Sequence, residues 1–322
     1  MNRLLETFSD YYNRLYFRNF QNALAREVYE ILGTSFSNSD GEVKMVTDLC
    51  KAIDGETFGA LKLHATKIHG SRSFVEFYNQ YKPTTKELAD MAILSVATRD
   101  GDIVYEKTAF IQSKKEDTEN SWKIDQDQLY LLHNFPTFKG EKGIFRKNFG
   151  KEVIFQNHSE TLGNFGLFQS PGEMILVNAL SVFRLQQDDK ISFSDIRKYL
   201  HTRNNVFSTP LIDYPFWNET LYWYCKNFPK YGFPFFNLPF LGTSIVSFNI
   251  HEFIRNWLLF NIGEVVSIGE KAVNYDLRNF NRILLRKAGL SDFINLKTEN
   301  QQYEFDHNIA ILVAHINLDE KE

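Results

Sequence analysis

Two apolar stretches joined by a short turn constrain the fold of this chain more than any other feature. MAILSVA, at residues 91–97, and TAFIQSKK, at residues 108–115, both have the composition of strands, and the turn RDGD lies between them. A short turn implies antiparallel pairing, so the two strands should be neighbours in one sheet. Asp90 directly precedes the first strand, and the second ends in polar and charged residues. Polar residues at the ends of apolar strands often have a functional role.

Patterns on both sides of this pair indicate a mixed α/β fold. Apolar residues recur every three or four positions over residues 4–32, which predicts a long amphipathic helix that stops at Gly33. Residues 42–53 should form a short second helix, and residues 58–77 two strands separated by the turn HGSR. Further patterns predict helices at residues 125–135, 170–186, 192–203, 247–263 and 276–289, and a buried terminal strand at residues 308–316.

Composition narrows the class of protein. With 322 residues, of which 43% are hydrophobic, and with 30 Phe and 15 Tyr, the chain can bury a sizeable core and is not of the disordered class. Its two cysteines, Cys50 and Cys225, lie far apart, so neither a zinc site nor a disulfide framework is expected. The N-terminus is unlike a secretory signal, and no apolar run approaches the roughly 18 residues of a membrane span. We therefore expect a cytoplasmic protein that does not enter a membrane.

The strand pair also carries the best candidate for chemistry. Gln112 and Lys114 are two positions apart, so their side chains leave the same face of their strand, and antiparallel pairing brings Asp90 close to them. Carboxylate and amide oxygens suit Mg²⁺, while a lysine can orient an attacking water and stabilise charge that develops on a phosphate. These are the parts needed for metal-assisted hydrolysis of a phosphodiester bond.

This arrangement resembles the PD-(D/E)XK nuclease superfamily, in its variants that carry a Q-x-K strand. Asp90 matches the family's aspartate, Gln112 its acidic or amide position and Lys114 its lysine, although no proline precedes Asp90 directly. The resemblance implies that Asp90 and Gln112 are metal ligands, that Lys114 positions the nucleophile, and that a helix supplies a further glutamate. Glu27 is the candidate for that glutamate, with Glu30 and Glu87 as alternatives.

The resemblance also implies a domain organisation. It covers roughly residues 1–140, which should form a restriction-endonuclease-like mixed sheet flanked by helices. Residues 141–322 should form a mainly helical, aromatic-rich region that recognises the substrate or a partner.

Several residues outside the strand pair are candidates for substrate binding. A predicted helix after the Q-x-K strand carries Gln126, Gln128 and Tyr130, and similar nucleases place a glutamine and a tyrosine there to contact the active site. A capped surface helix would look the same. Lys67 and Arg72 lie on a basic segment that could be a phosphate-contacting edge or an ordinary polar strand face. Arginines recur every four residues on one face of the helix predicted at residues 276–289, at Arg278, Arg282 and Arg286. Such a stripe could bind phosphate groups or could simply face solvent.

Two functions follow from these observations. The first is a Mg²⁺-dependent endonuclease, with Mn²⁺ as a possible substitute, that acts on DNA rather than RNA in bacterial restriction or antiphage defence. Because the net charge is −4, DNA would have to be bound by a local basic surface. The alternative is a catalytically silent subunit that keeps the nuclease fold and binds a partner protein through the Phe- and Pro-rich residues 228–242, if these are exposed.

Overall fold

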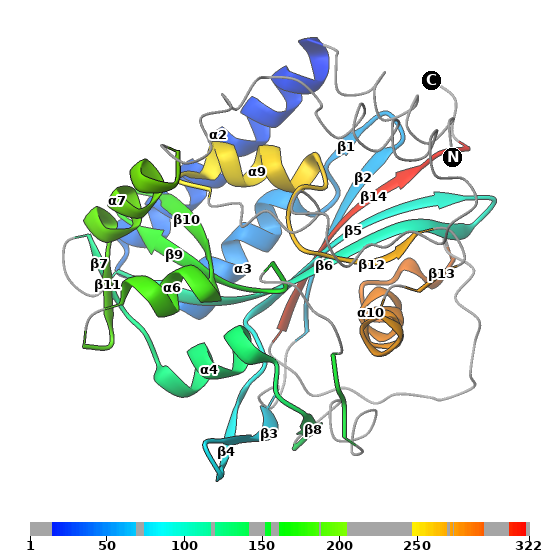
Figure 1. Cartoon of the computed structure of the whole chain (residues 1–322). Helices are drawn as coiled ribbons and strands as arrows, with labels where there is room; N and C mark the ends of the chain where they lie inside the picture. Colours follow the sequence, from blue (N-terminus) through cyan, green and yellow to red (C-terminus); the bar gives the residue numbers. More distant parts are fainter. Residues whose placement is uncertain are drawn as a thin grey trace.

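The computed structural model of the protein describes residues 15–68, 74–116, 120–141, 152–155, 161–186, 188–204, 247–268, 271–272, 274–292 and 309–319. These residues form a mixed α/β fold in which helices flank a central sheet (Figure 1). None of the described helices combines the length and apolar character needed to cross a membrane.

The central sheet contains parallel and antiparallel pairs. Its main path runs β1 (Thr57–Phe58), β2 (Leu61–Ile68), β14 (Ile309–Asn317), β5 (Met91–Arg99), β6 (Asp102–Lys115), β12 (Glu264–Ile268) and β13 (Lys271–Ala272). The long strand β6 has two neighbours on one edge, because β12 pairs with its first part and β9 (Gly163–Gln169) runs parallel to its second part. β10 (Glu173–Asn178) then pairs with β9, and β14 lies parallel to β5.

Helices cover both faces of this sheet and divide the buried side chains into two clusters. On one face α2 (Leu15–Ser37), α3 (Glu42–Ile53) and α9 (Ile250–Leu258) pack over residues such as Met91 and Ile93. The other face carries α4 (Gln126–Asn134), α6 (Ala179–Leu185), α7 (Phe193–Asn204) and α10 (Tyr275–Lys287), which pack over Ala92 and Leu94 (Figure 1). Successive side chains of β5 therefore point into the two clusters in turn, as expected for a strand in a sheet buried on both faces.

Smaller elements complete the fold. β3 (Phe74–Asn79) pairs with both β4 (Lys82–Glu87) and β8 (Phe138–Gly140), and this small sheet lies beside α4 (Figure 1). β7 (Ser121–Lys123) pairs with β11 (Lys190–Ser192), and a short 3₁₀ helix, Leu290–Asp292, follows α10.

Several predicted elements are confirmed. The helix expected at residues 42–53 is α3, and α4, α7, α9 and α10 lie within or next to their predicted ranges. The terminal strand β14 is buried as predicted. The first helix, however, does not stop at Gly33 but continues to Ser37. A Cβ atom at Gly33 would lie 2.8 Å from the carbonyl oxygen of Pro171, so this glycine permits close packing instead of ending the helix.

One other predicted element is wrong. Residues 170–186 do not form one helix, since strand β10 occupies the first part and only α6 is helical. A short apolar run fits a buried strand as well as a helix, and the side chain of Asn178 caps the real helix by accepting from the Ser181 N–H. The two strands predicted within residues 58–77 exist as β2 and β3, but they belong to different sheets.

The central sheet contains strands from both sides of the boundary expected near residue 140. Strands β9, β10, β12 and β14 come from beyond that point, and β14 lies between β2 and β5. The C-terminal part therefore contributes strands as well as helices. Cys225, Arg72 and the Phe- and Pro-rich residues 228–242 lie outside the described residues.

Candidate active site at the end of β5 and β6

The turn between β5 and β6 and a one-residue register shift beside it together set the register of the candidate site. Asp100 and Gly101 both have positive φ, 51° and 77°, as a two-residue hairpin turn requires. The ladder then shifts by one residue between Ala97 and Thr98, so that Met91 pairs with Ile111, and the Asp90 N–H donates to the Ile111 carbonyl at 3.0 Å. Asp90 therefore lies across from Gln112, where the sequence predicted it.

Polar contacts fix the Asp90 side chain against β6. Its Oδ2 accepts the Ser113 backbone N–H at 2.7 Å and a hydrogen bond from the side-chain amide of Gln112. The Asp90 carbonyl also accepts the Ala310 N–H at 2.9 Å, which ties this residue to β14. Asp90 is thus held by strands that lie far apart in sequence.

The pKa of the Asp90 carboxyl lies close to neutral pH. Burial raises its pKa to about 7, and the charges of Glu87 and Glu42 act in the same direction. The Ser113 N–H and the positive charge of Lys114 oppose this shift without cancelling it. A further cation close to Asp90 would favour the carboxylate form.

Gln112 offers an oxygen that is not engaged in hydrogen bonding. Its side chain is only 3% exposed, and its Oε1 has no hydrogen-bond partner among the described residues. A buried polar atom without a partner is unusual in a folded protein. The Asp90 carboxylate and this amide oxygen belong to residues that already contact each other, so the donor set suits a small hard cation.

Lys114, on the same strand, lines a pocket of about 620 Å³, whereas Asp90 and Gln112 are not among its lining residues. The Lys114 ammonium makes no hydrogen bond or ion pair with any residue that the structure describes, although its charge acts on Asp90. The other two lysines of the lining are engaged, because Lys115 donates to the Asp40 carbonyl at 2.6 Å and Lys123 lies 3.8 Å from Asp189. The carboxylates of the lining belong to Glu42, Glu116, Asp125, Asp127 and Asp189.

Glu42 is the functional candidate that the sequence analysis missed. It begins α3, its Oε1 accepts the Lys115 backbone N–H at 2.8 Å, and it lines the pocket together with Lys114. Glu27 and Glu30, in contrast, are exposed residues of α2. The only available signal was the position of Glu42 at the start of a predicted helix, and that does not reveal which strand end the helix approaches.

The predicted substrate residues of α4 have mainly packing contacts. Gln128 is buried, and the Tyr130 ring stacks on Phe77 with the centroids 6.2 Å apart. It is Gln126 that reaches the pocket, where its side chain bonds to Gln186.

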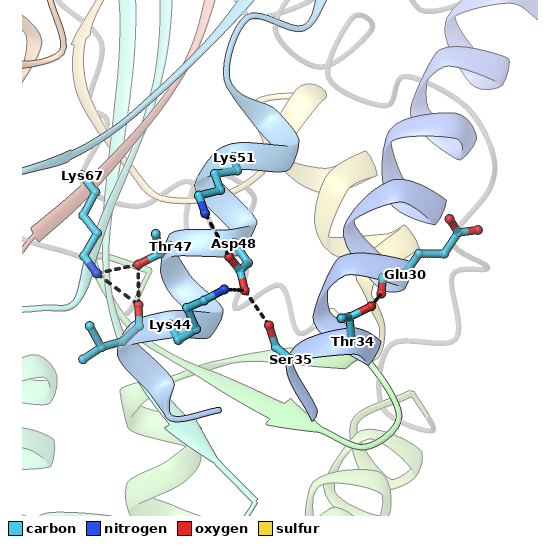
Figure 2. A network of polar contacts seen from close by, with 9 residues as sticks. Glu30, Thr34, Ser35, Lys44, Thr47, Asp48, Lys51 and Lys67 are labelled. Carbon is cyan, nitrogen blue, oxygen red and sulfur yellow. Dashed lines mark hydrogen bonds and ion pairs between the residues drawn. The ribbon is translucent and has the colours of Figure 1, made fainter. Parts of the chain in front are cut away.

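Lys67 belongs to a polar network that docks α3 between α2 and β2 (Figure 2). Its Nζ donates to the Thr47 hydroxyl at 2.6 Å and to the Val43 carbonyl at 3.1 Å. Asp48 accepts a hydrogen bond from the Ser35 hydroxyl at 2.6 Å, and this contact joins α3 to α2. Asp48 also accepts from Lys44 of its own helix. Lys67 thus holds the helix that carries Glu42, and its charge also interacts with that of Asp90.

The arginine stripe of α10 faces partly inward. Arg282 lies 3.3 Å from Glu106, a fully buried carboxylate that also accepts from Asn281 at 2.9 Å and from Ser267 at 3.0 Å. Arg278 and Arg286 are half-buried on the same helix. The central arginine therefore joins α10 to β6.

Comparison of the sequence with family models and with curated proteins, and of the fold with solved structures, gives no match.

Proposed function

We propose that this protein is a metal-dependent nuclease that hydrolyses phosphodiester bonds, with DNA as the preferred substrate. The observation that supports the proposal is the hydrogen bond from the Gln112 amide to the Asp90 carboxylate, with Lys114 two positions further along β6 and its charge acting on Asp90. A carboxylate, an unpaired buried amide oxygen and an ammonium that faces a pocket are complementary to a metal ion and a phosphate.

Mg²⁺ is the proposed cofactor, and Mn²⁺ should replace it. Asp90 and Gln112 would hold the ion through oxygen atoms, and the unsatisfied Oε1 of Gln112 is the observation that supports this fit. Magnesium commonly binds one or two carboxylates and keeps several waters, so a small set of protein ligands is sufficient. When bound, the ion would polarise the phosphate and favour formation of the nucleophile.

The remaining chemistry falls to residues of the pocket. The Lys114 ammonium would orient the attacking water and stabilise the negative charge that develops on the phosphate. We assign to Glu42 the role of the additional glutamate, in place of Glu27, because Glu42 lines the pocket and its charge acts on Asp90. The resemblance of the Q-x-K strand to PD-(D/E)XK nucleases supports a restriction or antiphage role in the bacterial cytoplasm.

Cleavage assays with a matched pair of lysine variants test the proposal. Lys114→Ala should reduce cleavage of plasmid or linear DNA in Mg²⁺ by orders of magnitude, with little change in melting temperature. Lys198→Ala is the control, because Lys198 is an exposed residue of α7 outside the pocket lining. Equal cleavage by wild type and Lys114→Ala would refute the catalytic role. If wild type cleaves neither DNA nor RNA, even with a candidate partner protein, the silent interaction subunit becomes the better hypothesis.

A further inference from the structure

The tip of the β3–β4 hairpin carries Tyr81 with a positive φ, a backbone conformation that is unfavourable for a residue with a side chain. Asn79 pairs with Lys82, so Gln80 and Tyr81 form a two-residue turn, with φ values of 47° and 72°. Such turns favour Asn-Gly, and residues with side chains are strained there. Tyr81 is nevertheless 98% exposed, so its ring gains no packing within the described fold. A strained residue whose side chain faces solvent points to a role outside folding.

A second aromatic and a lysine accompany Tyr81. Tyr78 is 61% exposed on the outer face of β3, whereas Val75 and Phe77 on the inner face are buried. Lys82 is exposed next to the turn, whereas Lys86, the other lysine of residues 78–86, pairs with Asp125. Exposed rings beside positive charge are complementary to nucleic acid, because bases stack on the rings and phosphates approach the lysine.

The hairpin is attached to the rim of the pocket that Lys114 lines, both toward its base and next to its turn. Lys86 donates to Asp125 at 2.6 Å and lies 3.7 Å from Asp127, and the Asn79 amide donates to Asp127 at 2.9 Å. Asp125 and Asp127 both line the pocket. Asn79 directly precedes the turn, so the hairpin lies against the pocket rim almost up to its tip. Tyr81 is two residues beyond Asn79, which is roughly 7 Å along a strand.

We propose that the hairpin tip, formed by Tyr78, Tyr81 and Lys82, binds an unpaired stretch of DNA, with the Tyr81 ring stacked on a base. This inference rests on the proposed nuclease function, since it makes the hairpin an extension of the Lys114 pocket. The tip lies close to the pocket rim, because Asn79 beside the turn bonds to Asp127 of the lining. The contacted base would thus lie close to the nucleotide that occupies the Lys114 pocket.

Binding measured without cleavage tests the proposal. The probe is a fluorescently labelled single-stranded oligonucleotide of roughly 20 nucleotides, titrated in EDTA and followed by anisotropy. Tyr81→Gly removes the ring and relieves the positive φ, so binding should weaken about 5- to 150-fold while the melting temperature stays equal or rises. Tyr81→Phe keeps the stacking surface and should bind like wild type. Tyr275→Ala is the control, because Tyr275 is 71% exposed on α10.

The outcomes separate this inference from the proposed function. If Tyr81→Gly binds like wild type, if Tyr81→Phe loses as much as Tyr81→Gly, or if wild type does not bind single strands, the stacking role is wrong. DNA cleavage that depends on Lys114 would still support the nuclease in each of those cases. Conversely, if DNA binding depends on Tyr81 but no cleavage is found, the stacking role is supported and the nuclease function is refuted.

Discussion

Asp90 and Gln112 lie across from each other where β5 begins and β6 ends, and the Gln112 amide donates a hydrogen bond to the Asp90 carboxylate. The contact joins one acidic side chain to one neutral side chain, so a bound cation would meet less negative charge than two carboxylates supply. The neutral partner also lets the site fold without a metal, because two facing carboxylates would repel each other.

Replacing Gln112 tests this account. Gln112→Glu would place a second carboxylate beside Asp90, so we expect a lower melting temperature in EDTA and a larger rise on adding Mg²⁺ than wild type shows. Cleavage activity should be retained. The measurement is a series of melting curves over increasing Mg²⁺.

A double variant provides the control. In Asp90→Asn/Gln112→Glu only one carboxylate remains, so the destabilisation in EDTA should be smaller and the response to Mg²⁺ weaker. If Mg²⁺ changes the melting temperature of Gln112→Glu no more than that of wild type, these two residues do not form a metal site.

The choice of glutamate gives a second prediction. Glu42→Gln should lower cleavage strongly, because Glu42 lines the Lys114 pocket and its charge acts on Asp90. Glu27→Gln should cleave like wild type, since Glu27 is an exposed residue of α2. Initial cleavage rates of the two variants in Mg²⁺ decide the assignment. The reverse order of rates would restore the sequence-based choice of Glu27.

Local features of the sequence predicted more of this site than distant ones did. The turn RDGD predicts the antiparallel pairing of β5 and β6, and a spacing of two residues predicts the shared face of Gln112 and Lys114, so both could be deduced from neighbouring residues. The one-residue register shift between Ala97 and Thr98, which places Asp90 across from Gln112, has no such local signal. Glu42 could not be deduced either, because it reaches the site through contact between α3 and the end of β6. That contact joins segments about 70 residues apart, since Glu42 bonds to Lys115.

In the fold, too, features set by local sequence could be predicted, and features set by long-range contacts could not. The periodic helices α3 and α10 were predictable from their apolar stripes. The insertion of β14 between β2 and β5 was not, because no local pattern specifies which strands a terminal strand will join. Strand β10 was mistaken for a helix since its apolar run is buried on both faces and lacks the alternation that marks a half-exposed strand.

The Asp48 network should make stability depend on pH in the acid range. Burial acts to raise the pKa of Asp48, but hydrogen bonds from Lys44 and Ser35 and the charges of Lys44 and Lys51 outweigh it, so the pKa lies below its usual value. The unfolded chain therefore takes up the proton first as the pH falls below about 4. The stabilisation from Asp48 is present above that pH and is lost as the pH falls through the folded-state pKa.

Asp48→Asn measures this contribution. Near pH 7 the variant should be less stable than wild type by about 1–3 kcal/mol, and the difference should shrink near pH 3. Urea unfolding at both pH values gives the two free energies. Glu30→Gln is the control, because the Glu30 side chain extends away from the network in Figure 2. A difference that stays constant with pH would show that the carboxylate charge of Asp48 is not what stabilises α3.

The arginine stripe of α10 gives the last prediction, which separates a structural role from phosphate binding. Arg282→Ala would leave Glu106 buried without its nearest cation, so we expect a loss of roughly 3 kcal/mol or more in unfolding free energy. Burial already raises the pKa of Glu106, and loss of the arginine charge would raise it further, so the defect should grow as the pH increases. Adding Glu106→Gln to Arg282→Ala should recover part of the stability, and Arg197→Ala, at an exposed site on α7, should change it little. Chemical denaturation of these variants checks the stability, and oligonucleotide binding checks the phosphate role. If Arg282→Ala is as stable as wild type but binds DNA weakly, the stripe is a phosphate-binding surface and the ion pair with Glu106 is dispensable.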